Sequence, residues 1–383
     1  MTMANTLGVY NPIFYANEAL IALKKALGLA GRIHRGYDEE RKSFGKGDTI
    51  NIRRPSTFTA ANAPATAADL DTETVGITLD QWKEVKFKLT DKELAYTGQR
   101  IIDDHIAPAA YALADNVDQA LASLYAKVPN YYDLSGTPVV ADVSGPRQVL
   151  FDLNAPVHDD ANMHYMMNGA LGHSLMGLAA FSQYQGAGPA GVETQQRGTL
   201  GWKYGMECFM NQNTPSHTNG SMADTAGAIL AGGFSAGAST ISIDDLTDAQ
   251  TVKAGDVFTI AGDSQKYVFT ADGTVASNAL TAIGIYPALK QDAAADAVVT
   301  IRSDSHVANL AFHRNFAALA MAPLSEIGND LGAKIASITD PDSGLSIRSR
   351  LYYVGDSSEV HVALDILYGY TILDGNLACR ACG

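Results

Sequence analysis

Alternating apolar and polar residues between positions 46 and 128 predict a long β-hairpin followed by a long helix. The outgoing strand covers residues 49–55. The returning strand would carry Val75, Ile77, Leu79, Val85, Phe87 and Leu89 on one face and Glu84, Lys86 and Lys88 on the other. Residues 56–73 between the strands are mostly Ala, Thr, Asp and Asn. A tip of this composition has little to pack on itself, so we expect another copy of the chain to cover it.

The helical part begins with a capping-box spacing, Thr90 and Glu93, in which each side chain satisfies a backbone N–H at the helix start. We predict one helical stretch over residues 91–104 and a second that begins near Pro108, because proline suits the first turn of a helix. The second stretch has a narrow apolar stripe of Ala110, Leu113, Val117, Ala120 and Leu124. About 20 residues would form a rod of ~30 Å. A single amphipathic helix on a core would show the same stripe.

The two ends of the chain have simpler patterns. Residues 13–30 are predicted to form a helix with one apolar face, made of Ala16, Leu20, Leu23 and Leu27. We place this helix in an N-terminal arm, residues 1–45, that is loosely tied to the hairpin after it. Residues 345–354 and 361–373 alternate again and predict two strands of a closing sheet.

The composition changes near residue 221 and stays rich in Ala, Gly, Thr, Asp and Val until about residue 303. Short strands are predicted at residues 240–243, 256–260, 266–270, 280–285 and 298–301, with a turn at 261–264. Five short strands with turn signals are typical of a small sandwich or barrel. Because larger residues return on both sides, we interpret residues 222–303 as an inserted β domain.

Size and charge narrow the function. A chain of 383 residues with 46% hydrophobic and 18% charged residues can bury a sizeable core. The net charge of −14 argues against a dedicated nucleic-acid binder, which needs clustered Lys and Arg. We expect no membrane span, because no apolar run approaches the ~18 residues that one needs, and no signal peptide. Three cysteines indicate a reducing compartment, so we expect the protein to be made in a cytoplasm.

Two motifs suggest ligand chemistry, and each has a simpler interpretation. Residues 186–191 match G-x-G-x-x-G, but no clear strand precedes them and no clear helix comes after, so a loop is the better interpretation. Residues 158–164 include His158, Asp159, Asp160 and His164. The two histidines are six positions apart, which puts them on different faces of a helix, and metal sites on helices use closer spacings. Polar residues around a turn explain this cluster without a metal ion.

The remaining candidate chemistry is weaker. Cys379 and Cys382 form a C-x-x-C pair close to the last residue, and Cys208 adds only one more thiol, so we interpret the pair as two thiols on a frayed tail. No Ser-His-Asp arrangement is visible. Arg53 and Arg54, together with Lys83, Lys86 and Lys88, predict a basic patch on an acidic protein. Such a patch is either a solvated face or a surface that docks on an acidic neighbour.

The order of these segments resembles the major capsid proteins of tailed phages, and most of all the coat protein of the short-tailed Salmonella-phage type, which carries an inserted domain. The stretches that carry the resemblance are residues 47–55, 88–94, 101–108, 252–262, 309–320 and 344–348. They cover both sides of the predicted insertion, and their order is more specific than any one of them.

The resemblance implies an α+β chain with the HK97-like capsid fold: an N-terminal arm, an extended hairpin loop, a spine helix, and peripheral and axial domains. Its implied segments are residues 1–45 (arm), 46–90 (extended loop), 91–128 (spine helix), 129–221 and 304–383 (peripheral and axial domains) and 222–303 (inserted barrel or sandwich). It further implies hexamers and pentamers of the chain, a scaffolding protein and a portal as partners, and double-stranded DNA enclosed without sequence-specific binding.

The predicted function is therefore structural: a capsid subunit in the virion, assembled in the bacterial cytoplasm, with no catalytic, metal or cofactor residue. As candidate subunit contacts we name Arg53, Arg54, Phe58, Leu70, Trp82, Lys86 and Lys88. Three alternatives stay open: an encapsulin-like shell around an enzyme, a metal-dependent hydrolase that uses the histidine and aspartate cluster of residues 158–164, and a surface adhesin built on the β-rich segment.

Overall fold

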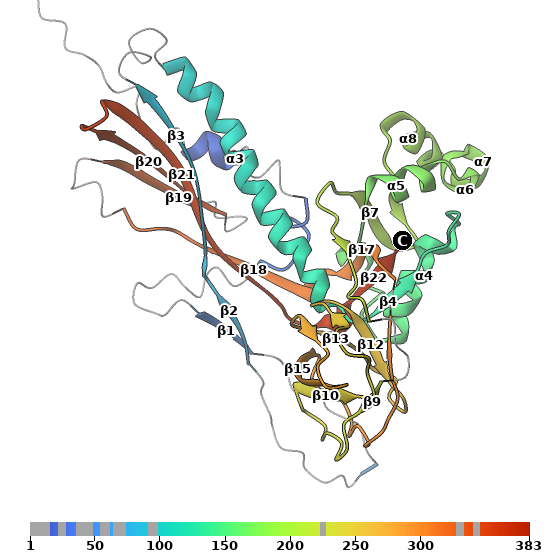
Figure 1. Cartoon of the computed structure of the whole chain (residues 1–383). Helices are drawn as coiled ribbons and strands as arrows, with labels where there is room; N and C mark the ends of the chain where they lie inside the picture. Colours follow the sequence, from blue (N-terminus) through green and yellow to red (C-terminus); the bar gives the residue numbers. More distant parts are fainter. Residues whose placement is uncertain are drawn as a thin grey trace, which may run out of the picture. The chain divides into compact units, whose positions relative to one another are not determined.

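The computed structural model describes residues 16–21, 28–35, 49–53, 62–63, 74–90, 99–222, 227–302, 304–326, 333–339 and 345–383 (Figure 1). Helices and strands are mixed along the chain, which confirms the predicted α+β class. The chain forms two compact units. The first unit comprises residues up to 118 and residues 317–373, and the second comprises residues 119–316 and 374–383. None of the described helices is both long and apolar enough to cross a membrane.

The first unit contains a five-stranded antiparallel sheet built around β21 (Glu359–Ile372). One side of β21 pairs with β20 (Ser346–Val354) and β18 (Ala317–Ala322), and the other side pairs with β3 (Gln81–Thr90). β19 (Lys334–Thr339) pairs with β20. The two strands predicted near the end of the chain are confirmed as β20 and β21.

The predicted hairpin is correct only in its first part. β1 (Thr49–Arg53) pairs with β2 (Thr74–Thr78), as expected for a ribbon. The second half of the predicted returning strand is β3, whose partner is β21 rather than the outgoing strand, with Lys88 opposite His361. Residues 81–90 of the predicted hairpin segment 46–90 are therefore paired within the main sheet.

The base of the β1–β2 ribbon packs inside its own chain. Its buried residues and their neighbours on β18 form one apolar cluster: Ile50, Ile52, Ile77, Leu79, Ala318, Ala320 and Ala322. The base of the ribbon therefore does not need another copy of the chain for its packing. The small alanines of β18 let the ribbon approach closely, so the alternating isoleucines are buried locally. The tip lies outside the described residues apart from Asn62 and Ala63, which are exposed.

A single helix, α3 (Gln99–Ala122), replaces the two predicted helical stretches. Pro108 lies inside it, so the prediction that a second helix begins there is wrong. Proline removes one intrahelical hydrogen bond, but Ile106 before it and the buried stripe after it pack against the rest of the unit and hold the helix in place. Of the predicted stripe, Ala120 is half-buried and the other residues, Ala110, Leu113, Val117 and Leu124, are buried. Glu93 of the predicted capping box lies outside the described residues.

Helix α3 covers one face of the five-stranded sheet (Figure 1). Phe87 of β3 meets His105 of α3 edge-on, with ring centroids 5.9 Å apart. Tyr368 of β21 donates a hydrogen bond from its hydroxyl to Oδ1 of Asn116, at 2.9 Å. The apolar side of β3 that the alternation predicted is therefore the side that faces the helix.

Part of the predicted N-terminal arm is tied firmly to this unit. Residues 16–21 are helical, with Ala16 and Leu20 buried as predicted, while Leu23 and Leu27 lie outside the described residues. The buried carboxylate of Asp118 accepts hydrogen bonds from the backbone N–H groups of residues 28–30, at 2.9–3.3 Å. A charge-assisted cluster of this kind is stronger than a set of neutral hydrogen bonds. The expectation of a loosely tied arm is wrong for these residues.

The second unit contains a seven-stranded sheet covered by short helices. Its strand order is β4 (Tyr131–Asp133), β22 (Ala378–Cys382), β17 (His306–His313), β5 (Met163–Met167), β7 (Met206–Met210) and β6 (Gly201–Lys203), and β8 (Ser216–His217) also pairs with β17. The helices are α4 (Ala141–Asp152), α5 (Gly169–Met176), α6 (Ala179–Ser182), α7 (Tyr184–Ala187) and α8 (Pro189–Arg197). One core, which includes Leu150, Tyr165 and Met206, joins the sheet to α4, α5 and α6.

The β-rich segment forms a barrel. Its strand order is β16 (Val299–Ile301), β12 (Val257–Ile260), β13 (Lys266–Phe269), β15 (Leu280–Tyr286), β10 (Thr240–Asp244) and β9 (Ala228–Ile229), with β11 (Thr251–Val252) and β14 (Gly273–Thr274) as a separate pair. Backbone hydrogen bonds from Ile229 to Ala297 and from Val299 to Gly227 join the first strand to the last and close the barrel. Five strands were predicted within one or two residues of their bounds, whereas the two-residue strands β9, β11 and β14 were missed.

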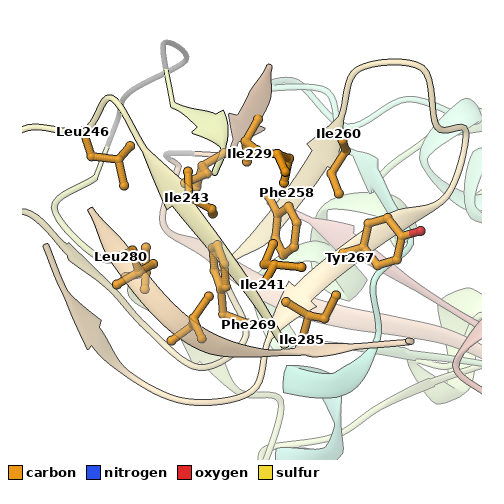
Figure 2. Close-up of a cluster of buried hydrophobic side chains, with 14 of the residues drawn as sticks. Ile229, Ile241, Ile243, Leu246, Phe258, Ile260, Tyr267, Phe269, Leu280 and Ile285 are labelled. Atoms are coloured by element: carbon orange, nitrogen blue, oxygen red, sulfur yellow. The ribbon is translucent and has the colours of Figure 1, made fainter. Parts of the chain in front are cut away.

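The barrel has its own core, shown in Figure 2. Phe258 and Phe269 stack with ring centroids 4.4 Å apart, and Tyr267 lies against Phe258 at 5.6 Å. All buried residues of this core lie within 222–301, so the segment builds its core from its own side chains. The barrel and the seven-stranded sheet nevertheless belong to one compact unit.

The packing of the ribbon base can be tested with Ile77→Ala. Ile77 is fully buried against β18, so we expect its loss to lower the free energy of unfolding by about 2–4 kcal/mol. Denaturant unfolding of the unassembled chain measures this change. Thr78→Ala is the matched control, because Thr78 is the exposed neighbour on the same strand and should change the value by less than about 0.5 kcal/mol. Equal effects of the two substitutions would contradict the packing.

Candidate subunit-contact surface

The face of the five-stranded sheet opposite α3 carries the three predicted contact residues of β3, Trp82, Lys86 and Lys88. Strand alternation puts Trp82, Glu84, Lys86 and Lys88 of β3 on this side. The register adds two arginines of β20 and an aspartate of β21 beside them. We call this the charged sheet face, defined by Trp82, Glu84, Lys86, Lys88, Arg348, Arg350, His361 and Asp365.

The centre of the charged sheet face is the carboxylate of Asp365, which is fully buried. Arg348 holds it with two hydrogen bonds, Nε to Oδ1 at 3.0 Å and Nη2 to Oδ2 at 2.5 Å. Arg350 adds a contact from Nη2 to Oδ2 at 3.1 Å and reaches Glu84 at 2.9 Å. A buried carboxylate is tolerated only when its oxygens are paired in this way. The network therefore fixes the side chains of three neighbouring strands.

Trp82 is the exposed part of this network. Its side chain is 57% exposed, yet its Nε1 donates a hydrogen bond to Oδ2 of Asp365 at 3.2 Å. An indole that is held by a buried ion pair loses little rotamer freedom when a partner covers it. Tryptophan is also enriched among residues that dominate binding energy. Among the described candidates, Trp82 is thus the best fitted to anchor a contact.

Lys88 and Lys86 have different partners within the chain. Lys88 donates to Oε1 of Glu359 at 2.6 Å, and this hydrogen bond, with those from His361 and Ser357, lowers the pKa of Glu359 to about 2. Lys86 lies over the ring of Tyr352, with Nζ 5.1 Å from the centroid. The predicted basic patch is therefore partly neutralised within the chain.

The rest of the predicted patch is split. Lys83 shares the parity of Val85 and Phe87, so it lies on the opposite side of β3 and not with Lys86. Arg54, Phe58 and Leu70 lie outside the described residues, as does the side chain of Arg53. Asp365 and the two arginines were missed because no local pattern links β3 to a strand about 280 positions later.

A second polar cluster lies inside the second unit, around Arg380 of β22. Arg380 is fully buried, and its guanidinium donates to three backbone carbonyls: Val128 at 2.7 Å, Gly255 at 2.8 Å and Ala126 at 3.3 Å. Burial lowers its pKa to about 10, so it remains charged at neutral pH. Two of these carbonyls end the 3₁₀ helix η3 (Ser123–Lys127), where a cation is favourable. Gly255 belongs to the barrel.

Histidine, tyrosine and aspartate side chains complete the cluster, which we call the Arg380 junction, defined by Tyr125, His217, Asp256, His306 and Arg380. The ring of Tyr125 lies beside the guanidinium at 5.3 Å, and its hydroxyl is 3.0 Å from Nδ1 of His217. Nε2 of His217 is 2.8 Å from Oδ1 of Asp256. The other oxygen of Asp256 accepts the backbone N–H groups of Gly220 and Lys253. Both oxygens of this carboxylate are thus engaged.

Within this junction, the ring of His306 lies 5.3 Å from that of His217. Its Nδ1 is 2.9 Å from the carbonyl oxygen of Asp304, and its buried Nε2 has no hydrogen-bond partner among the described residues. Burial, together with the nearby Arg380 and Arg302, lowers the pKa of His306 to about 4. It is therefore neutral near pH 7.

The residues proposed for a metal-dependent hydrolase do not converge. Asp159 accepts hydrogen bonds from Asn162 and His313, which lower its pKa. His164 lies on β5, where its Nδ1 is 2.8 Å from Oε2 of Glu207. No group of three or more His, Cys, Asp or Glu within the described part of the chain is arranged to hold a metal ion. The 3₁₀ turn η4 (Asp160–Asn162) lies between His158 and the strand that carries His164.

The glycine motif lies among helices. Residues 186–191 span the end of α7 and the start of α8, with Gly188 between them at a positive φ of +60°. The interpretation as a loop is therefore wrong. A strand must precede a dinucleotide-binding turn, and here the chain before it forms α6 and α7. Gly191 packs so closely on the backbone of residues 182–183 that a Cβ would meet it at 3.0 Å.

The cysteine pair is also placed differently from the prediction. β22 lies between β4 and β17, and all five of its residues are buried, so Cys379 and Cys382 are not on a frayed tail. Burial raises the pKa of Cys382 to about 11 and that of Cys208 to about 12, and raises the pKa of Cys379 as well. Thiols of this kind stay protonated and unreactive.

No family model matches this chain, and no curated protein matches it. Among solved structures it is similar to one from Mycobacterium phage Che8, at 14% identity and a TM-score of 0.49, over 93% of this chain and 90% of that one. It is similar to the capsid of cyanophage P-SCSP1u at 10% identity and 0.43, over 89% and 84%, and to the mature capsid of bacteriophage PhiM1 at 9% and 0.45, over 88% and 82%. Because these TM-scores are below 0.5, the function has to be inferred from the residues of this chain.

The ion pair between Lys88 and Glu359 should make the free energy of unfolding depend on pH in the acidic range. Because the pKa of Glu359 is about 2 in the folded chain and near 4.5 when unperturbed, its contribution is present above about pH 4.5 and is lost as the pH falls towards 2. Glu359→Gln should therefore lower stability most above pH 4.5, with a gap to wild type that narrows on acidification. Denaturant unfolding at several pH values measures this. Glu193→Gln, which removes an exposed carboxylate of α8, controls for the loss of one charge, and a pH-independent gap would contradict the assignment.

His306 should make the free energy of unfolding depend on pH over a different range. Its pKa is near 6.5 when unperturbed and about 4 in the folded chain, so the unfolded chain binds its proton first. Stability should fall as the pH drops from about 6.5 to 4. His306→Asn keeps a donor for the carbonyl of Asp304 and removes the titrating group. We expect a shallower fall of unfolding free energy between about pH 7 and 5 in this variant, and identical slopes would contradict the prediction.

Proposed function

We propose that this chain is the structural subunit of a closed protein shell, the capsid of a tailed double-stranded DNA phage with the HK97-like fold. The observation that carries the proposal is the order of elements in the first unit. A two-stranded ribbon leads directly into the outer strand β3 of a sheet, and a helix of 24 residues then covers that sheet. This order resembles the extended loop, peripheral sheet and spine helix of such subunits.

The ribbon suits a subunit that reaches its neighbours. Its base is fixed by Ile50, Ile52 and Ile77 on β18, so the direction in which the ribbon leaves the sheet is set within the chain. Residues 54–73 connect the two strands of the ribbon and are poor in large apolar residues. A connection of about twenty residues that goes out and returns can span at most about 30 Å. We propose that a neighbouring copy covers this tip.

The charged sheet face supplies a second contact. Trp82 is exposed and held in one orientation by Asp365, while Lys86 remains available beside it. Shell interfaces need surfaces of roughly 800 Å² per partner, and many weak contacts together stabilise a closed assembly. We propose that Trp82, Lys86 and Lys88 contact a neighbouring subunit, along with the predicted Arg53, Arg54, Phe58 and Leu70.

The wider assembly is inferred from the same resemblance. We propose hexamers and pentamers of the chain, a scaffolding protein and a portal as assembly partners, and a head that encloses DNA without sequence-specific contacts. The net charge of −14 supports a shell that makes few electrostatic contacts with the phosphates of the enclosed DNA. The barrel, residues 227–302, would be the inserted domain of the subunit.

Electron microscopy of the full-length chain tests the proposal. The chain is purified from a bacterial host and imaged alone and with a tailed-phage scaffolding protein, at increasing concentrations. We expect uniform shells or tubes. A monodisperse monomer under all of these conditions would contradict the proposal, and shells that copurify with an enzyme in place of nucleic acid would favour the encapsulin-like alternative.

The contact role of Trp82 is tested with two substitutions at that position. Trp82→Phe keeps an aromatic ring but loses the hydrogen bond to Asp365, and Trp82→Ala removes the ring as well. We expect Trp82→Ala to raise the concentration at which assembly begins by about tenfold or more, since a hot-spot residue contributes about 2 kcal/mol, and Trp82→Phe to have a smaller effect. Unfolding free energies of both unassembled variants serve as the control. Normal assembly of Trp82→Ala would remove this residue from the contact.

A further inference from the structure

The Arg380 junction joins three segments that are far apart in the sequence. Arg380 lies on strand β22 of the seven-stranded sheet, its carbonyl partners Ala126 and Val128 end the 3₁₀ helix η3, and Gly255 lies in a barrel turn. The chain enters the barrel after β8 and leaves it before β17, so only two connections link the barrel covalently to the sheet. Side-chain contacts must therefore set how the barrel is held within the second unit.

Further contacts hold the barrel at strand β4 and at Gly375. Lys266 and Arg302 lie on the ring of Tyr131, with Nζ and the guanidinium carbon 3.9 and 4.8 Å from its centroid. The hydroxyl of Tyr286 accepts a hydrogen bond from the backbone N–H of Gly375 at 3.3 Å. Cation–π contacts of this kind are modest in water. Arg302 also forms an ion pair with Asp133, whose side chain is exposed to water, and the contact of Tyr286 involves no charge.

Arg380 differs because it is both charged and fully buried. Its three donor contacts are to carbonyls, and two segments must be in place together to supply them. If the barrel turn moved away, the guanidinium would lose the carbonyl of Gly255, and a hydrogen bond to a charged group contributes more than a neutral one. Gly255 has φ +100°, and a Cβ there would meet the ring of His217 at 3.1 Å. Only a glycine therefore lets the barrel turn approach His217 this closely.

The neighbouring polar groups make the same connection. Tyr125 belongs to η3, His217 to β8 and Asp256 to the barrel turn, and each is hydrogen-bonded to the next. Asp256 also holds the N–H of Gly220 at the entrance to the barrel. All of these groups are satisfied only when η3, β8 and the barrel turn are assembled.

We propose that the Arg380 junction is a conformational lock, which fixes the barrel to the seven-stranded sheet and to η3 as one rigid body. When the lock opens, the barrel keeps its own core and becomes a module tethered by two connections. The lock opens and closes as a unit, because the guanidinium and the chain of hydrogen bonds through His217 share the same segments.

Hydrogen exchange of backbone amides in the unassembled full-length chain tests the lock. The informative amides are Val128, which is bonded to the carbonyl of Tyr125, and Gly255, which is bonded to that of Phe269. Arg380→Met keeps the length of the side chain and removes its donors. We expect both amides to exchange at least about tenfold faster in this variant, because hydrogen bonds to a charged group are among the stronger ones. Amides of the barrel core, such as Phe258, should change much less.

The control is Arg197→Met on α8, where the arginine side chain is 74% exposed and makes an i,i+4 ion pair. It should leave all three amides unchanged. Two results would overturn the proposal: unchanged exchange of Val128 and Gly255 in Arg380→Met, or acceleration of Phe258 as large as that of Gly255, which would make Arg380 a general stabiliser of the barrel.

Wild-type protein gives an independent test if Arg380→Met does not fold. In low concentrations of denaturant, Val128 and Gly255 should exchange through one shared opening, with the same free energy and the same denaturant dependence. Different opening free energies or different denaturant dependences for the two amides would overturn the proposal. Arg380→Lys, which keeps the charge but cannot reach three carbonyls at once, should lower that shared free energy without separating the two amides.

Discussion

The first unit is built around the backbone hydrogen bonds of β21. Every backbone N–H and C=O of a buried strand needs a partner, and β21 satisfies this demand over 14 residues with β18 and β20 along one edge and β3 along the other. The pairing with β3 decides where the ribbon leaves the sheet and which face α3 covers. It also brings Trp82 and Glu84 beside Asp365, whose buried carboxylate is paired with the two arginines of β20 and accepts the hydrogen bond from Trp82.

The alternation of apolar and polar residues predicted the strands that have an apolar core on one face and polar surroundings on the other. The parity of β3 is visible in the sequence because Val85 and Phe87 face a helix while Lys86 and Lys88 face outward. The longer barrel strands were predicted within two residues for the same reason, since each has an apolar core on one side. Alternation alone thus grouped Lys86 and Lys88 correctly on one face, and Trp82 shares their parity.

The features that sequence reasoning missed depend on partners far along the chain. β22 is buried on both faces and has no alternation, so its place near the last residue suggested a frayed tail. The carbonyls that satisfy Arg380 come from 125 to 254 positions earlier and leave no local signal. The network around Asp365 links residues some 280 positions apart. Pro108 shows the converse case: a local rule for starting a helix was overridden by the long buried stripe of α3.

Closure of the barrel by β9 and β16 has a consequence for molecules held at high density. An open sheet presents unpaired backbone groups on which any passing strand can add, whatever its sequence. Within residues 227–302, the bonds from Ile229 to Ala297 and from Val299 to Gly227 use those groups internally. Neighbours therefore meet this part of the molecule through side chains, so its surface can vary by substitution while indiscriminate polymerisation is avoided.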